Sequence, residues 1–152
     1  MKMTARDLLG RILMTLTAAE VGIIPFLVDV TPTHIFNPAW PAHARLHGIW
    51  LLVSGGLFSL VALYLIWIRR EDRRSAITMA GVLLGGILAG FFTAVSTVSL
   101  YGGSIGVDRA DANAAGLPAA TGIPGNVRIF AIALLALLIG VVLARGAAAR
   151  QR

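Results

Sequence analysis

The sequence predicts an all-α integral membrane protein, a bundle of four membrane-spanning helices that forms one domain over residues 1–152. Of its residues 57% are hydrophobic and only 13% are charged, which is too apolar for a soluble domain of this length. Four apolar runs reach the roughly 20 residues that a helix needs to cross a bilayer. We expect the spans at residues 8–28, 48–68, 76–100 and 127–144.

The basic residues predict the orientation of the bundle. Ten of the 13 fall on one side of the expected spans: Lys2, Arg6, Arg11, Arg69, Arg70, Arg73, Arg74, Arg145, Arg150 and Arg152. Only Arg45, Arg109 and Arg128 fall on the other side. The positive-inside rule therefore places both termini in the cytoplasm, and we expect the membrane to be a bacterial inner membrane. Because topology explains the net charge of +6, we expect membrane lipids and not nucleic acid as partners.

The first span is expected to stay in the mature protein. Arg11 and Glu20 interrupt its apolar run, and no small-residue cleavage site follows, so it does not read as a signal peptide. Pro25 should kink this helix. The chain contains no cysteine, which excludes disulfides, thiolate metal sites and cysteine nucleophiles.

The first of two long outer loops, 29–47 and 101–126, carries all three histidines of the chain. Pro41 suits the first turn of a helix, so the second helix should begin near it. His43 and His47 then stand one turn apart on one face of that helix.

Glu20 is the second clue, because a carboxylate inside a span is costly and usually faces the bundle interior or a water-filled cavity. At 1.5 Å per residue, Glu20, Ser54 and Thr93 lie about 10–12 Å below the outer helix ends. We therefore expect a polar pocket in the outer half of the bundle. These three residues would form its floor, and His43, His47 and the first outer loop would form its roof.

Two chemistries fit such a pocket. Imidazoles at positions i and i+4 suit a divalent Zn, Fe or Cu ion, held by His43, His47 and Glu20, with Asp29 and His34 as alternates. The same three residues suit acid–base catalysis on a lipid-like substrate, with all three as catalytic candidates. Further residues expected to contact a ligand are Arg45, Asn37, Trp40, Ser54, Thr93 and Thr97.

Structural explanations stand beside these hypotheses. The histidines could simply meet water at the headgroup level, next to tryptophans that act as interfacial anchors. Glu20 could be a structural partner of a hydroxyl group or of an arginine. The hydroxyl groups of the third span could bond to carbonyl groups of their own helix.

Small residues predict close helix packing, because helices in lipid approach closely only where side chains are minimal. The glycines concerned are Gly55, Gly56, Gly81, Gly85, Gly86 and Gly90. This pattern indicates a bundle and carries no chemistry of its own.

Residues 36–47 contain Phe36-Asn37-Pro38, Trp40-Pro41, His43-Ala44-Arg45 and His47. This run resembles a family of small four-span membrane proteins of unknown function with an FNPxWPxHARxH-like signature. A looser similarity, in size and number of spans only, is to DoxX-like proteins and sterol-isomerase-related four-helix domains. Neither resemblance implies a reaction, a cofactor or a catalytic residue.

Two function classes stay open. The first is a ligand-binding protein or small membrane enzyme acting on a hydrophobic or amphipathic small molecule. The second is a non-catalytic subunit or assembly factor, whose glycine-lined faces dock onto another membrane protein or onto a second copy. Convergence separates them: a site needs Glu20, His47 and Thr93 to face one cavity, whereas a docking subunit could scatter them. A third class, a channel or transporter protomer, has less support in the sequence. One carboxylate inside the spans and no evident repeat offer little for alternating access.

Overall fold

The computed structural model of the chain describes residues 3–105 and 124–149, and this part is helical with no strand. The elements are α1 (Ala5–Gly22), α2 (Ile24–Asp29), α3 (Ala42–Trp67), α4 (Arg73–Ser96), the 3₁₀ turn η1 (Val98–Leu100) and α6 (Gly125–Ala149). The all-α prediction is confirmed for the described residues. Most of the second predicted outer loop, residues 106–123 of 101–126, lies outside them.

Four helical segments are long and apolar enough to cross a membrane: Ala5–Asp29, Ala42–Trp67, Arg73–Ser96 and Gly125–Gly146. They coincide with the four predicted spans. The second begins six residues before the predicted residue 48, because its first turns are helical although they are polar. The four apolar helices indicate an integral membrane protein.

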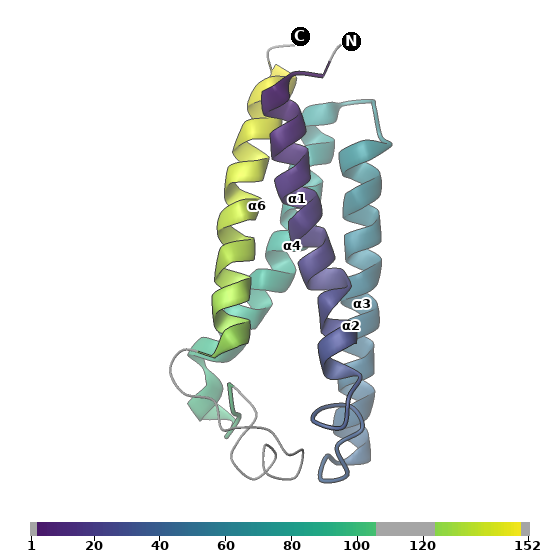
Figure 1. Cartoon of the computed structure of the whole chain (residues 1–152), viewed down its shortest axis with the longest axis vertical. Helices are drawn as coiled ribbons and strands as arrows, with labels where there is room; N and C mark the ends of the chain where they lie inside the picture. Colours follow the sequence, from purple (N-terminus) through teal and green to yellow (C-terminus); the bar gives the residue numbers. More distant parts are fainter. Residues whose placement is uncertain (1–2, 106–123, 150–152) are drawn as a thin grey trace.

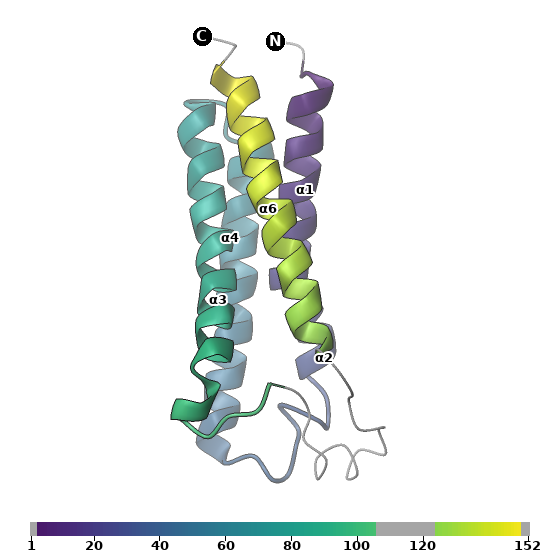
Figure 2. The ribbon, with the colours of Figure 1, turned by 90° about the vertical axis from the view of Figure 1, so that its left-hand side faces the viewer.

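The four long helices run alternately up and down (Figures 1 and 2). Each packs mainly against two neighbours, in the order α1, α3, α4, α6 and back to α1, and α1 also touches α4. The bundle has two distinct ends (Figure 1). The start of α1, the end of α6 and the connection between α3 and α4 lie at one end. Residues 30–41 lie at the opposite end. We call this second end the outer end.

The core is aliphatic and sits on the bundle axis. Met14, Ile66, Ile77, Leu84 and Leu88 are almost fully buried and pack in one cluster. Large apolar side chains also cover the outside of all four long helices, for example Leu16, Leu51, Val82 and Ile132. An exposed apolar surface of this extent is compatible with hydrocarbon as solvent and not with water.

The first span is broken between α1 and α2 at Ile23. Pro25 follows two residues later, in the first turn of α2. Proline lacks the N–H that would continue the helix, and its ring clashes with the carbonyl four residues earlier. The disturbance predicted at Pro25 is therefore present, as a break and not only as a bend.

Only part of the predicted glycine packing is found. A Cβ atom on Gly81 would lie 2.8 Å from Val141 of α6, and one on Gly55 would lie 3.1 Å from the carbonyl oxygen of Val21. Gly86 has nothing within 4 Å of such an atom, and neither does Gly90. The first two glycines allow close helix contacts, whereas the last two face open space.

Candidate functional site

The outer loop before α3 is held by Arg45. Its Nη2 donates to the carbonyl oxygen of Asn37 at 2.9 Å and approaches that of Pro38 at 3.5 Å. Asn37 is buried, and its side-chain oxygen accepts a hydrogen bond from the backbone N–H of Ala39 at 2.9 Å. This Asn-Pro turn therefore has a structural reason for both its asparagine and the arginine eight residues later.

Ile35 anchors the same loop by apolar contact. It is 5% exposed, and its side chain fills the space over Gly48, where a Cβ atom would lie 2.5 Å from its Cδ1. The ring of Trp40 lies at the same glycine. The loop is thus packed onto the first turns of α3, which fixes where α3 presents its polar residues.

His43 and His47 are brought together on those turns. Pro41 is the N-cap of α3, so both histidines are helical and one turn apart. Their Nε2 atoms are 3.0 Å apart and their ring centroids 4.6 Å apart. Both side chains are exposed, and the ring of Trp50 lies 5.8 Å from that of His47.

The third histidine has partners of its own. Nδ1 of His34 is 2.9 Å from the hydroxyl of Thr33, and its Nε2 is 3.9 Å from a carboxylate oxygen of Asp29. The two alternates that the sequence offered as metal ligands are therefore paired with each other. Within residues 3–105 and 124–149, no three His, Asp or Glu side chains are grouped closely enough to hold a metal ion.

Glu20 is half-buried on α1. Within the described part of the chain it makes neither an ion pair nor a hydrogen bond, and it is not grouped with the histidine pair. Its neighbour Thr17 is bonded: the hydroxyl lies 3.1 Å from the carbonyl oxygens of both Leu13 and Ala133, and its one hydrogen can be donated to either or shared.

The hydroxyl groups of α4 bond within their own helix. Thr93 is exposed and donates to the carbonyl oxygen of Ala89 at 2.8 Å, and Thr97 donates to that of Thr93 at 2.7 Å. Ser54 is half-buried on α3. In the described structure, no hydrogen bond joins Glu20 to Thr93, Thr97 or Ser54.

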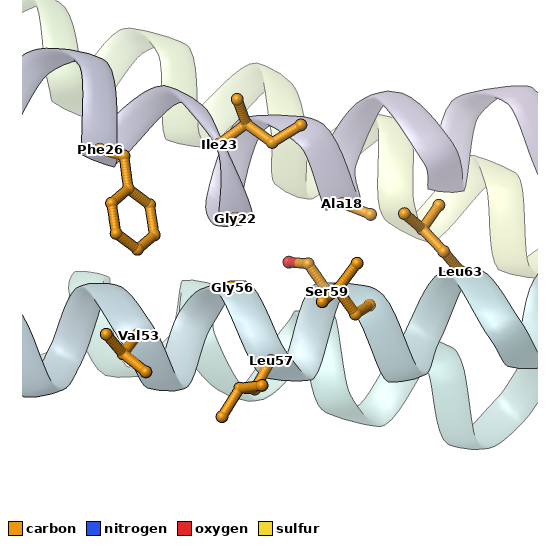
Figure 3. A pocket seen from close by; sticks show the side chains of 10 residues that line it. Ala18, Gly22, Ile23, Phe26, Val53, Gly56, Leu57, Ser59 and Leu63 are labelled. Carbon is orange, nitrogen blue, oxygen red and sulfur yellow. The ribbon is translucent and has the colours of Figure 1, made fainter.

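A groove that the sequence did not reveal lies between α1–α2 and α3 (Figure 3). Its volume is about 370 Å³, within the usual range of roughly 300–1,000 Å³ for small-molecule sites. Its walls are almost wholly apolar. They are formed by Ala18, Gly22, Ile23, Phe26, Val53, Gly56, Leu57, Ser59, Leu60 and Leu63.

Two glycines and a serine shape this groove. The ring of Phe26 lies over Gly56, where a Cβ atom would be 3.4 Å from it. Ser59 faces Gly22 closely enough that a Cβ there would lie 2.5 Å from the serine hydroxyl (Figure 3). That hydroxyl is buried and has no hydrogen-bond partner in the described structure. Gly56 was predicted only as a packing residue, and no signal singled out Ser59.

A comparison with known families matches residues 13–150 to DUF6640, a family of unknown function. The chain belongs to this family. Searches of the curated proteins and of the solved structures found no match to this chain. Membership of DUF6640 confirms the predicted resemblance to a family of unknown function, and no comparison supports the looser likeness to DoxX-like proteins.

In this DUF6640 chain the 36–47 run separates into two kinds of residue. Asn37, Trp40 and Arg45 hold the loop against α3, by the contacts described above. The two histidines of the run are exposed, and among the described residues they form a hydrogen bond with each other. Within this run, His43 and His47 are therefore the polar residues that do not hold the loop.

Proposed function

We propose that this protein binds an amphipathic small molecule from the membrane, with the apolar chain of the ligand lying in the groove between α1–α2 and α3. The observation that carries the proposal is the groove itself, an apolar space of about 370 Å³ between two candidate spans. Hydrocarbon is the solvent around it, so a ligand with an acyl-like chain has direct access.

The polar end of the ligand belongs at the outer end of α3. Val53 lines the groove, and toward the start of α3 it is followed by Trp50 and then His47, each three residues further. The rings of Trp50 and His47 lie 5.8 Å apart. The rise from Val53 to His47 is about 9 Å. A chain in the groove would therefore bring a head group to the level of the histidine pair.

The orientation is part of the proposal: both termini and the 69–74 connection are cytoplasmic, in a bacterial inner membrane. Its support is the excess of arginine at that end, among them Arg6, Arg69 and Arg74, against Arg45 and Arg128 at the outer end. Single cysteines can test it cleanly because the chain has none. A membrane-impermeant maleimide added to intact cells should label Ala39→Cys and not Glu71→Cys, and the reverse labelling would overturn the orientation.

The test of binding uses native mass spectrometry of the protein extracted in mild detergent. Gly56→Leu fills the groove, and Gly86→Leu adds the same side chain where nothing lies within 4 Å. We expect a bound small molecule on the wild type and on Gly86→Leu and its loss from Gly56→Leu, with helical content unchanged. Equal retention by both variants would contradict the proposal.

A second candidate function is that of a docking subunit in a larger membrane complex. Its support is the pair Gly86 and Gly90, four residues apart on α4 with open space over both. In that case Gly86→Leu should remove a co-purifying membrane protein while Gly56→Leu retains it. Ligand binding therefore predicts that Gly56→Leu loses its bound molecule, whereas docking predicts that Gly86→Leu loses its partner protein.

A further inference from the structure

The histidine pair at the outer end brings two ring nitrogens close enough to bind one metal ion. The two Nε2 atoms, 3.0 Å apart, are closer than the ring centroids, 4.6 Å apart, so both nitrogens lie on the sides of the rings that face each other. Both side chains are exposed near the start of α3, outside the apolar groove. Without a metal the pair can share one proton in a single hydrogen bond, one ring donating and the other accepting.

We propose that His43 and His47 bind one divalent transition-metal ion through their Nε2 atoms, with the remaining positions filled by water. At a metal–nitrogen distance of about 2.0–2.1 Å, a separation of 3.0 Å corresponds to a nitrogen–metal–nitrogen angle of about 95°. This angle fits the tetragonal geometry of Cu(II) and Ni(II) directly. Tetrahedral Zn(II) needs about 3.3 Å, a small displacement of two exposed side chains.

The site is formed by these two residues alone and does not use Glu20. No third His, Asp or Glu is grouped with them in the described residues, so an ion would keep open positions. Such an ion would be held by one helix and would be accessible from the outer end. The inference does not depend on the groove, since none of the groove residues takes part.

His34 supplies a matched control. It belongs to the same end of the bundle, but its ring nitrogens lie near Thr33 and Asp29 and not near the pair. Replacing it removes a histidine without touching the proposed ligands. The four proteins to compare are the wild type and the variants His34→Ala, His43→Ala and His47→Ala, all without a histidine tag.

The test is titration of the metal-stripped, detergent-purified proteins with Cu(II), followed by electron paramagnetic resonance. We expect one Cu(II) per chain and hyperfine coupling to two nitrogens for the wild type and His34→Ala. Losing a group that only orients a metal ligand already weakens binding by about 10- to 100-fold, so each of the other variants should lose at least tenfold in affinity. Unchanged affinity in His43→Ala or His47→Ala would overturn the proposal, and so would an equal loss in His34→Ala or one metal per two chains.

Discussion

Gly10 of α1 and Gly140 of α6 face each other where the two helices cross. A Cβ atom on Gly10 would lie 2.7 Å from the carbonyl oxygen of Gly140, and one on Gly140 would lie 2.8 Å from that of Gly10. The nearest atoms in each case are backbone atoms, which cannot rotate aside. The contact between the first and last spans therefore depends on two residues 130 positions apart in the chain.

Gly10→Ala should destabilise the bundle by about 1–3 kcal/mol, the usual cost of overpacking a close contact. Gly86→Ala is the matched control, because its new methyl group meets nothing within 4 Å and removes a flexible glycine from a helix. The measurement is equilibrium unfolding in mixed micelles. Equal stability of Gly10→Ala and the wild type would mean that the crossing is looser than described.

Two buried hydroxyl groups should respond differently to removal. Thr17 bonds across to the carbonyl oxygen of Ala133 on α6, so Thr17→Val should cost about 0.6 kcal/mol and at most about 1.7 kcal/mol. Ser59 has no partner within the described structure, so Ser59→Ala should be neutral or stabilising. The same unfolding assay compares the two, and a larger loss from Ser59→Ala than from Thr17→Val would contradict this assignment.

Arg45→Ala should loosen the outer loop while leaving the bundle folded. A hydrogen bond to a charged group contributes about 1.5–3 kcal/mol, and here it joins α3 to the carbonyl oxygen of Asn37. Hydrogen exchange in residues 31–40 should therefore become faster by one to two orders of magnitude. Arg128→Ala, which removes an exposed arginine at the same end, serves as the control. Unchanged exchange in Arg45→Ala would show that the loop is held without this hydrogen bond.

Glu20→Leu should stabilise the fold. The carboxylate has no ion pair or hydrogen bond in the described residues, and an acidic side chain inside a span costs up to about 3 kcal/mol. Glu20→Gln should give a smaller gain. The measurement is equilibrium unfolding, and a loss of stability would mean that the carboxylate makes a stabilising interaction. A gain in stability together with a loss of ligand binding would indicate that Glu20 has a functional role.

The spans were readable from the sequence because length and apolarity alone define them. The start of α3 shows the limit of hydropathy, since His43, Arg45 and His47 are helical but too polar to extend an apolar run. The preference of proline for the first turn of a helix, applied to Pro41, was the signal that predicted this start.

The helical rise predicts a depth for each polar residue, but it does not predict the direction in which the side chain points. Thr93 was placed near the level of Glu20 and is in fact exposed, bonded to its own helix at Ala89. Rotation of a helix about its axis is set by packing against its neighbours, which no spacing in one chain reports. The glycines show the same: Gly81 meets Val141, whereas Gly86 meets nothing.

The groove was missed for a related reason. Its walls come from the first span and α3, and they include Gly22, Gly56 and Ile23, the residue at which the first span breaks. From the sequence, Gly56 was visible as a packing residue and Pro25 as a source of a kink. Only their registration across the α1–α3 contact makes a cavity, and that registration is a property of the folded bundle.

The most direct test of the binding proposal is photo-crosslinking with a fatty acid that carries a diazirine on its chain, followed by mapping of the labelled peptides. The groove predicts that label concentrates on residues 18–26 and 53–63, and that Gly56→Leu abolishes this concentration while Gly86→Leu preserves it. Label spread evenly over the outward faces of all four spans, in the wild type and both variants alike, would mean that lipid only surrounds the protein and does not bind in the groove.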